Sequence, residues 1–216
     1  MELPDNIITH YLRNVYFVAG GLCGGKTTVS KCLATKYGLT LYNWDEKYLE
    51  HKAISDSQHQ PEMHRHGFGG DWEAYFSRPP VEWAASLTTA IREQVNIAIV
   101  DLIHQATDGT IIVDGVFPYE MLECISVPER CVFLYATMDV IRRDHFRRDD
   151  KQDMLECIMR LKDPEQAKEN VFRASELVYV KDMERVKHSP FPDYIRDINR
   201  NDDHILREIE EHFGLS

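Results

Sequence analysis

The apolar residues of this chain gather into five short runs that have the lengths of β-strands. They are residues 15–18 (VYFV), 39–43 (LTLYN), 110–114 (TIIVD), 131–136 (CVFLYA) and 194–198 (YIRDI). Val, Ile, Tyr and Phe are frequent in these runs, which favours strands over helices. Segments with helical spacing separate the runs. This alternation predicts a mostly parallel sheet with helices on both of its faces.

The segments between the strands repeat their apolar positions every three or four residues, as helices do. The clearest example is residues 81–106, with apolar positions at Ala84, Leu87, Ile91, Val95, Ala98, Leu102 and Ala106. Asp108-Gly109 ends this long predicted helix. Residues 55–70 are polar and predict a loop. Other helices are predicted at residues 28–37, 46–53, 118–125, 138–162, 165 to about 185, and 205–213.

The composition indicates the general class of protein but does not indicate its activity. The 216 residues suffice for one α/β domain with a generous insertion. No apolar run approaches the roughly 18 residues that span a bilayer, and the polar N-terminal sequence does not resemble a signal peptide. Five cysteines without close pairing predict reduced thiols in the cytoplasm, and a net charge of −11 argues against a nucleic-acid partner. We therefore expect a single cytoplasmic domain spanning residues 1–216, with neither membrane nor nucleic acid as a partner.

One segment carries a specific chemical signal. Residues 20–27 (GGLCGGKT) follow the first strand run and precede a helical segment, and they fit the pattern Gly, four residues, Gly-Lys-Ser/Thr. Chance alone produces this pattern in about two sequences per thousand of this length, before the flanking strand and helix are considered. The alternative is a glycine-rich turn that binds nothing. The residues predicted to surround a triphosphate are Gly20, Gly21, Leu22, Cys23, Gly24, Gly25, Lys26, Thr27 and Thr28.

The chemistry of this segment suits a nucleoside triphosphate. Its glycines let backbone N–H groups turn towards phosphates, and the helix that follows adds the positive end of its dipole. Lys26 is predicted to bridge the β- and γ-phosphates, and the Thr27 hydroxyl to ligate Mg²⁺. Cys23 is close to these amides and to Lys26, which could lower the pKa of its thiol and allow redox control; the alternative is a passive small residue.

Two carboxylates follow strand runs and so are expected at the same edge of the sheet as this segment. Asp114 ends the third run, where it can hold Mg²⁺ beside Thr27, or else cap the turn that follows. Asp45 comes just after the second run, where it can orient or deprotonate an acceptor hydroxyl. The alternative for Asp45 is to cap the helix predicted from Glu46.

A run of arginines in residues 141–148 (IRRDHFRR) is the last candidate feature. In a continuous helix Arg143 and Arg147 are one turn apart and share a face, so they could stabilise a transferring phosphoryl group. The alternative is a solvated face paired with neighbouring aspartates. Arg78 and Arg173 are weaker candidates for anchoring an acceptor. The predicted catalytic residues are Lys26, Asp45, Arg143 and Arg147.

The order of these parts resembles the P-loop kinases of small molecules, which include nucleoside monophosphate, shikimate and gluconate kinases. Residues 20–27 match the phosphate-binding loop of these kinases and are called the phosphate loop below. Residues 113–118 (VDGVFP) resemble the Asp-Gly-Phe-Pro-Arg element of adenylate kinases, with an inserted valine and with Tyr119 in place of the arginine. The resemblance implies a three-layer α/β/α fold with strand order 2-3-1-4-5, ATP and Mg²⁺ as cofactors, and an adenine-contacting loop at Arg200. It also implies a helical lid, for which residues 138–185 are the best candidate.

Together these features predict an ATP- and Mg²⁺-dependent kinase. Its partner would be a small hydroxyl- or phosphate-bearing acceptor of the nucleoside, nucleotide or sugar-acid class. A nucleotide-binding regulatory module is an alternative from another class. A kinase of nucleic-acid ends is a further alternative, which the acidic balance of the chain disfavours.

Overall fold

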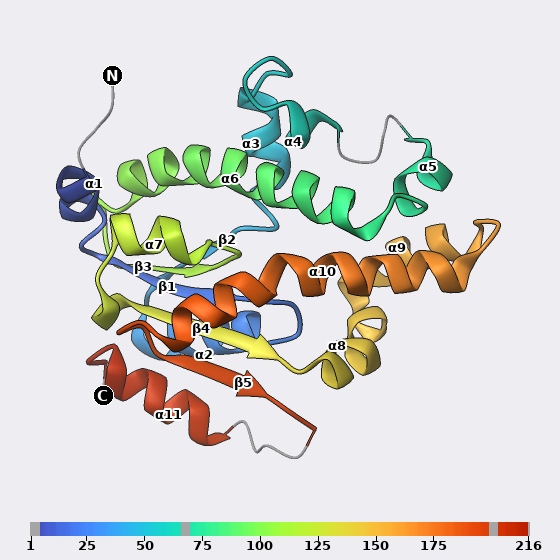
Figure 1. Cartoon of the computed structure of the whole chain (residues 1–216). Helices are drawn as coiled ribbons and strands as arrows, with labels where there is room; N and C mark the ends of the chain where they lie inside the picture. Colours follow the sequence, from blue (N-terminus) through green and yellow to red (C-terminus); the bar gives the residue numbers. More distant parts are fainter. Residues whose placement is uncertain (1–4, 66–69, 199–202, 216) are drawn as a thin grey trace.

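A parallel sheet forms the centre of the computed structural model, which describes residues 5–65, 70–198 and 203–215. Within these residues the sheet has five strands, in the order β2-β3-β1-β4-β5 (Figure 1). They are β1 (Val15–Gly20), β2 (Thr40–Asn43), β3 (Ile111–Asp114), β4 (Cys131–Ala136) and β5 (Asp193–Arg196). Every neighbouring pair is parallel. The predicted fold class and strand order are therefore confirmed.

Two layers of helices cover the sheet because its apolar side chains alternate between the two faces (Figure 1). Val15, Phe17 and Ala19 of β1 join one buried cluster, whereas Val18 joins the other. The first cluster is completed by α1 (Asp5–Tyr11), α6 (Pro80–Gln105), α7 (Tyr119–Ile125) and the second half of α10 (Pro164–Lys187). The second is completed by α2 (Lys26–Tyr37) and α11 (Asp203–His212). None of the described helices has the length and apolarity needed to cross a membrane.

The register of the strands brings the candidate residues to one edge. Val18 of β1 and Asn43 of β2 both pair with Asp114 of β3. The predicted phosphate loop (residues 20–27) after β1 and the turn after β2 therefore leave the sheet beside Asp114. This is the carboxyl edge, where open α/β sheets bind ligands.

The segment predicted as a loop at residues 55–70 contains a short helix, α4 (Pro61–Arg65), between α3 (Tyr48–Ile54) and α5 (Trp72–Phe76). The buried carboxylate of Glu93 on α6 accepts hydrogen bonds from the backbone N–H groups of Glu62 (3.3 Å) and Met63 (2.8 Å). These are orphan donors at the start of a helix. A cap supplied from about thirty positions further along the chain leaves no local signal in the sequence.

The helix predicted over residues 138–162 is broken into four pieces. They are α8 (Met138–Asp144), the 3-10 turns η3 (His145–Arg147) and η4 (Asp149–Lys151), and α9 (Gln152–Met159). The Gln152 side chain donates to the backbone carbonyls of Phe146 (3.0 Å) and Arg148 (2.9 Å). It thereby satisfies acceptors that a continuous helix would have used internally. Phe146 meanwhile turns inward to pack on Phe172 of α10, with ring centroids 5.5 Å apart.

Candidate nucleotide-binding site

The phosphate loop is fixed by close contact between its backbone and β4. Gly20 has φ +119°, and a methyl group there would lie 2.1 Å from the Leu134 carbonyl oxygen. A methyl group on Gly24 would lie 2.3 Å from the same oxygen. The Gly21 N–H donates to that carbonyl at 2.9 Å. Cys23 also has a positive φ of 56°, a conformation that non-glycine residues adopt mainly at functional sites.

Gly20→Ala is expected to destabilise the protein by about 2–4 kcal/mol, because overpacking adds to backbone strain at positive φ. Denaturant unfolding measures the change. Gly109→Ala is the matched control, since a methyl group there meets nothing within 4 Å and its φ is not positive. Equal stability of the two variants would show that the loop does not depend on its contact with Leu134.

Lys26, the first residue of α2, points back into the loop. Its ammonium group donates to the Gly21 carbonyl at 2.6 Å. Burial lowers the pKa of Lys26, while the nearby carboxylates of Asp114 and Asp45 act to raise it. The side chain thus lies within electrostatic reach of both candidate carboxylates, at the start of a helix that itself favours anions.

Thr27 and Asp114 form the pair expected of a magnesium site. The Thr27 hydroxyl lies close enough to the carboxylate of Asp114 to influence its pKa, and Asp114 is 5% exposed. Burial raises the pKa of Asp114, and the neighbouring Thr27 hydroxyl and the charge of Lys26 oppose that rise. A hydroxyl and a carboxylate are oxygen donors of the kind that Mg²⁺ prefers, so these residues fit the ion. The helix that follows β3 begins later, with Pro118 at its N-cap position, so Asp114 does not cap it.

Asp45 lies in the turn between β2 and α3. Its backbone N–H donates to the Asn43 side-chain oxygen at 3.0 Å, which holds the turn. Helix α3 begins at Tyr48 with Lys47 at its N-cap position, so Asp45 is not the cap residue that was the alternative prediction. The Asp45 carboxylate is exposed and lines the same cavity as the phosphate loop.

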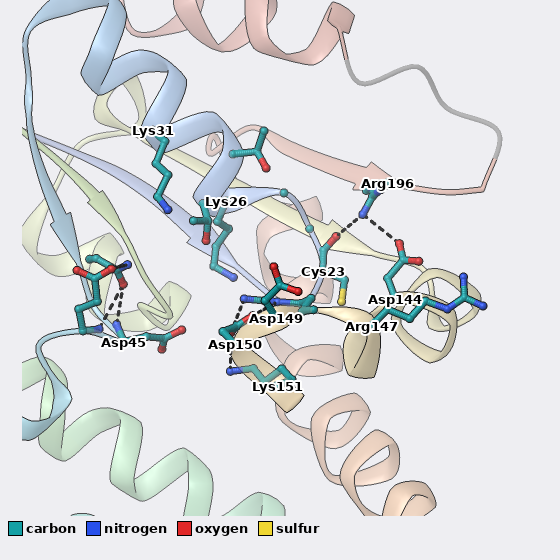
Figure 2. A pocket seen from close by; sticks show the side chains of 17 residues that line it. Cys23, Lys26, Lys31, Asp45, Asp144, Arg147, Asp149, Asp150, Lys151 and Arg196 are labelled. Carbon is teal, nitrogen blue, oxygen red and sulfur yellow. Dashed lines mark hydrogen bonds and ion pairs between the residues drawn. The ribbon is translucent and has the colours of Figure 1, made fainter. Parts of the chain in front are cut away.

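That cavity has a volume of about 820 Å³, within the range of small-molecule sites. It extends from the turn after β2, past the phosphate loop, to the end of β5 (Figure 2). Asp45 and Arg196 lie towards its opposite ends, with Lys26 between them. Besides these three, the lining includes residues 23–25, Thr27, Thr28, Lys31, Asn43, Glu46, Asp144 and residues 147–151.

The arginines are arranged differently from the sequence prediction. Arg147 lines the cavity, but Arg143 lies outside the described set of lining residues and makes two hydrogen bonds to Asp144, at 2.7 and 2.8 Å. Helix α8 ends at Asp144 and a 3-10 turn follows, so Arg143 and Arg147 no longer belong to one helical face. Arg148 lines the cavity instead, bonded to Asp150 at 2.8 and 2.9 Å.

Arg196 is a lining residue that the sequence analysis did not identify. It ends β5, and its guanidinium donates to the Cys23 carbonyl at 3.3 Å and lies 3.4 Å from Asp144. The signal was available, because a charged residue that ends a parallel strand reaches the same edge as Asp114 does. The predicted Arg200 lies outside the described residues.

Three other expectations concern side chains around the site. Burial raises the pKa of the Cys23 thiol, although Arg148 and Lys26 act to lower it, which agrees with the alternative of a passive small residue and not with redox control. Arg78 stacks over Tyr75, 4.3 Å from its ring centroid, and lies outside the described cavity lining. Arg173 pairs with glutamates of its own helix.

His145 predicts a pH dependence of stability. It is 3% exposed, and neither ring nitrogen has a hydrogen-bond partner among the described residues. Burial, aided by Lys151 and Arg148 and opposed by Asp150, lowers the pKa of its imidazole to about 4. Because this folded-state pKa is below the unfolded value of about 6.5, the unfolded chain binds more protons between the two values. The stability that His145 contributes is therefore present above pH 6.5 and is lost as the pH falls through 4.

We expect the His145 contribution to fall by about 3 kcal/mol across that interval. His145→Phe keeps a buried ring but cannot take up a proton. The difference in unfolding free energy between this variant and the wild type, measured from pH 7 to pH 4, isolates the effect. The exposed His104 supplies the matched control, His104→Phe. Parallel curves for wild type and His145→Phe would contradict the expectation.

Comparisons with known proteins add little to this geometry. No protein-family model and no curated protein sequence matches the chain. Similar solved structures include a crystal structure described as a "putative kinase from Chloroflexus aurantiacus", with a TM-score of 0.47 and 18% identity. The match covers 92% of this chain and 97% of the other. At these values the likeness carries no argument about activity, which must come from the residues of the site.

Proposed function

We propose that this protein is an ATP- and Mg²⁺-dependent kinase that transfers a phosphoryl group to a small acceptor. The observation that carries the proposal is that Thr27 and Lys26 both lie next to the buried carboxylate of Asp114, beside a glycine-rich loop that β4 fixes in place. A glycine-rich turn that binds no ligand does not require a buried carboxylate beside a threonine hydroxyl and a half-buried lysine. Such groups are costly to bury without function.

Different residues around the cavity would bind the phosphoryl donor, ATP, and the acceptor. Lys26 and the loop amides would hold the triphosphate, and Thr27 and Asp114 would hold Mg²⁺, which neutralises developing charge when bound. Arg147 and Arg148 come from the lid side and would stabilise the phosphoryl group in transit. Asp45 would orient the acceptor hydroxyl and take its proton.

Two measurements test the proposal. Calorimetry should show ATP binding that weakens when EDTA removes Mg²⁺. ADP formation should then depend on an added acceptor, in a screen of nucleosides, nucleotides, sugars and sugar acids. Binding of ATP without acceptor-dependent turnover would favour a nucleotide-controlled binding module instead.

The lid is expected to be smaller than the sequence suggests. The first half of α10 packs with α9 and α5, whereas Val178, Tyr179 and Val186 of its second half belong to the core beside the sheet. Tyr179 also lies against the phosphate loop, 3.3 Å from the position of a methyl group on Gly21. Closure should therefore involve residues 142–163 and not the second half of α10.

Hydrogen exchange measures this difference. With a non-hydrolysable ATP analogue, Mg²⁺ and an acceptor, amides of residues 142–163 should exchange more slowly than in the free protein. Amides of residues 178–187 should be protected already and change little. Equal slowing over all of residues 138–185 would instead mean that the whole segment moves as one body.

A further inference from the structure

The charged residues of the cavity are unevenly distributed along its wall. Beyond the phosphate loop it ends at the turn after β2, where Asn43, Asp45 and Glu46 form the wall. If Lys26 holds the terminal phosphates of ATP as proposed above, an acceptor would lie between Lys26 and this turn. Two of the three side chains in this wall are carboxylates.

Asn43 holds the backbone of this turn and the carboxylate of Glu46. The Asn43 side-chain amide donates to the Glu46 carboxylate at 2.8 Å, and its oxygen accepts the backbone N–H groups of Asp45 (3.0 Å) and Glu46 (3.4 Å). Among the described residues, no hydrogen bond or ion pair engages the Asp45 carboxylate. It faces the cavity with its charge balanced only at longer range by Lys26 and Arg148.

Half of the described cationic side chains of the cavity are paired with carboxylates of the same lining. Among the described lining residues there are six cations, at Lys26, Lys31, Arg147, Arg148, Lys151 and Arg196, and five carboxylates, at Asp45, Glu46, Asp144, Asp149 and Asp150. Arg148 and Lys151 are paired with Asp150, and Arg196 with Asp144. The described lining therefore has one more cation than carboxylate. Mg²⁺ only partly neutralises a bound triphosphate, so the triphosphate would outweigh this excess of positive charge. An anionic acceptor would then meet unbalanced carboxylates, a form of selection against wrong substrates.

We propose that the acceptor is a neutral or positively charged hydroxyl compound, such as a nucleoside, a sugar or an amino sugar, and not a phosphate ester or a sugar acid. This inference rests on the proposed kinase function. Asp45 would bind the hydroxyl that is phosphorylated, and Glu46 would bind a second hydroxyl or an ammonium group of the same molecule.

Matched acceptors that differ in charge provide the test. ADP formation is followed at saturating MgATP with nucleosides against their 5′-monophosphates, and with sugars and amino sugars against sugar phosphates and sugar acids. The kcat/KM of neutral and cationic members should exceed that of their anionic partners by about tenfold or more. Glu46→Gln should narrow this ratio severalfold. Glu50→Gln should leave it unchanged, because Glu50 pairs with Lys47 and lies outside the described cavity lining.

The possible results distinguish a failure of the proposed acceptor class from a failure of the proposed kinase function. Preferred phosphorylation of the anionic partners would overturn the inference and leave the kinase standing. Tight MgATP binding with no turnover of any acceptor would overturn the proposed function, and the acceptor class with it. A ratio that Glu46→Gln does not change would remove Glu46 from acceptor selection.

Discussion

Lys26→Met is expected to reduce phosphoryl transfer from ATP by about 10²–10³-fold, the usual loss when one preorganised charge at a transferring group is removed. Methionine keeps the length of the side chain but not its ammonium group. In the free protein that group is bonded to the Gly21 carbonyl. Binding of ATP would exchange this neutral acceptor for charged phosphate oxygens, which make stronger bonds. Calorimetry and acceptor-dependent ADP formation measure the two parts of the effect.

The interpretation of that result depends on the fold remaining intact. The melting temperature of the variant should stay close to the wild-type value, because the lysine is already disfavoured as a charged group by its burial. Lys187→Ala removes an exposed lysine at the end of α10 and serves as the control. If the Lys26→Met protein folds, binds ATP and turns it over like the wild type, Lys26 does not bind the phosphates of ATP and the proposed site is wrong.

The sheet and one side of the site were predictable because their signals are local. Each strand is a short apolar run, and parallel strands end at a common edge. Asp114 ends one run and Asp45 follows another, so both carboxylates could be placed beside Lys26 without knowledge of the packing. The glycines of the phosphate loop add a constraint that the structure explains, because Gly20 and Gly24 leave no room for a side chain against β4.

The lid side of the site was not predictable in the same way. Its helix is interrupted because Gln152 satisfies the carbonyls of Phe146 and Arg148, and because Phe146 packs on Phe172. Both causes depend on tertiary contacts, whereas the apolar spacing of residues 138–162 alone favours one continuous helix. A break of this kind changes which arginines face the cavity, so Arg148 takes the place predicted for Arg143.

Asp45→Asn is expected to reduce phosphoryl transfer by about 10²–10⁴-fold, the contribution typical of a general base. Asparagine keeps the shape of the side chain and one hydrogen-bonding oxygen, but it cannot accept a proton from the acceptor hydroxyl. ATP affinity should change little, because in the proposed function residues 20–27, and not Asp45, would surround the triphosphate. The rate is measured with saturating MgATP and an acceptor identified in the matched screen, together with ATP binding by calorimetry.

Within the residues that the structure describes, the carboxylate of Asp45 has no part in stabilising the fold. Asp45 does not cap α3, and the turn that carries it is held by the Asn43 side chain and not by the Asp45 carboxylate. Removing its charge should therefore leave the melting temperature nearly unchanged, so a slower reaction could not be ascribed to a weakened fold. Asp139→Asn alters an exposed aspartate on α8, outside the described cavity lining, and is the matched control. If Asp45→Asn transfers the phosphoryl group as fast as that control, Asp45 has no part in the chemistry, and the acceptor must be activated from another wall of the cavity.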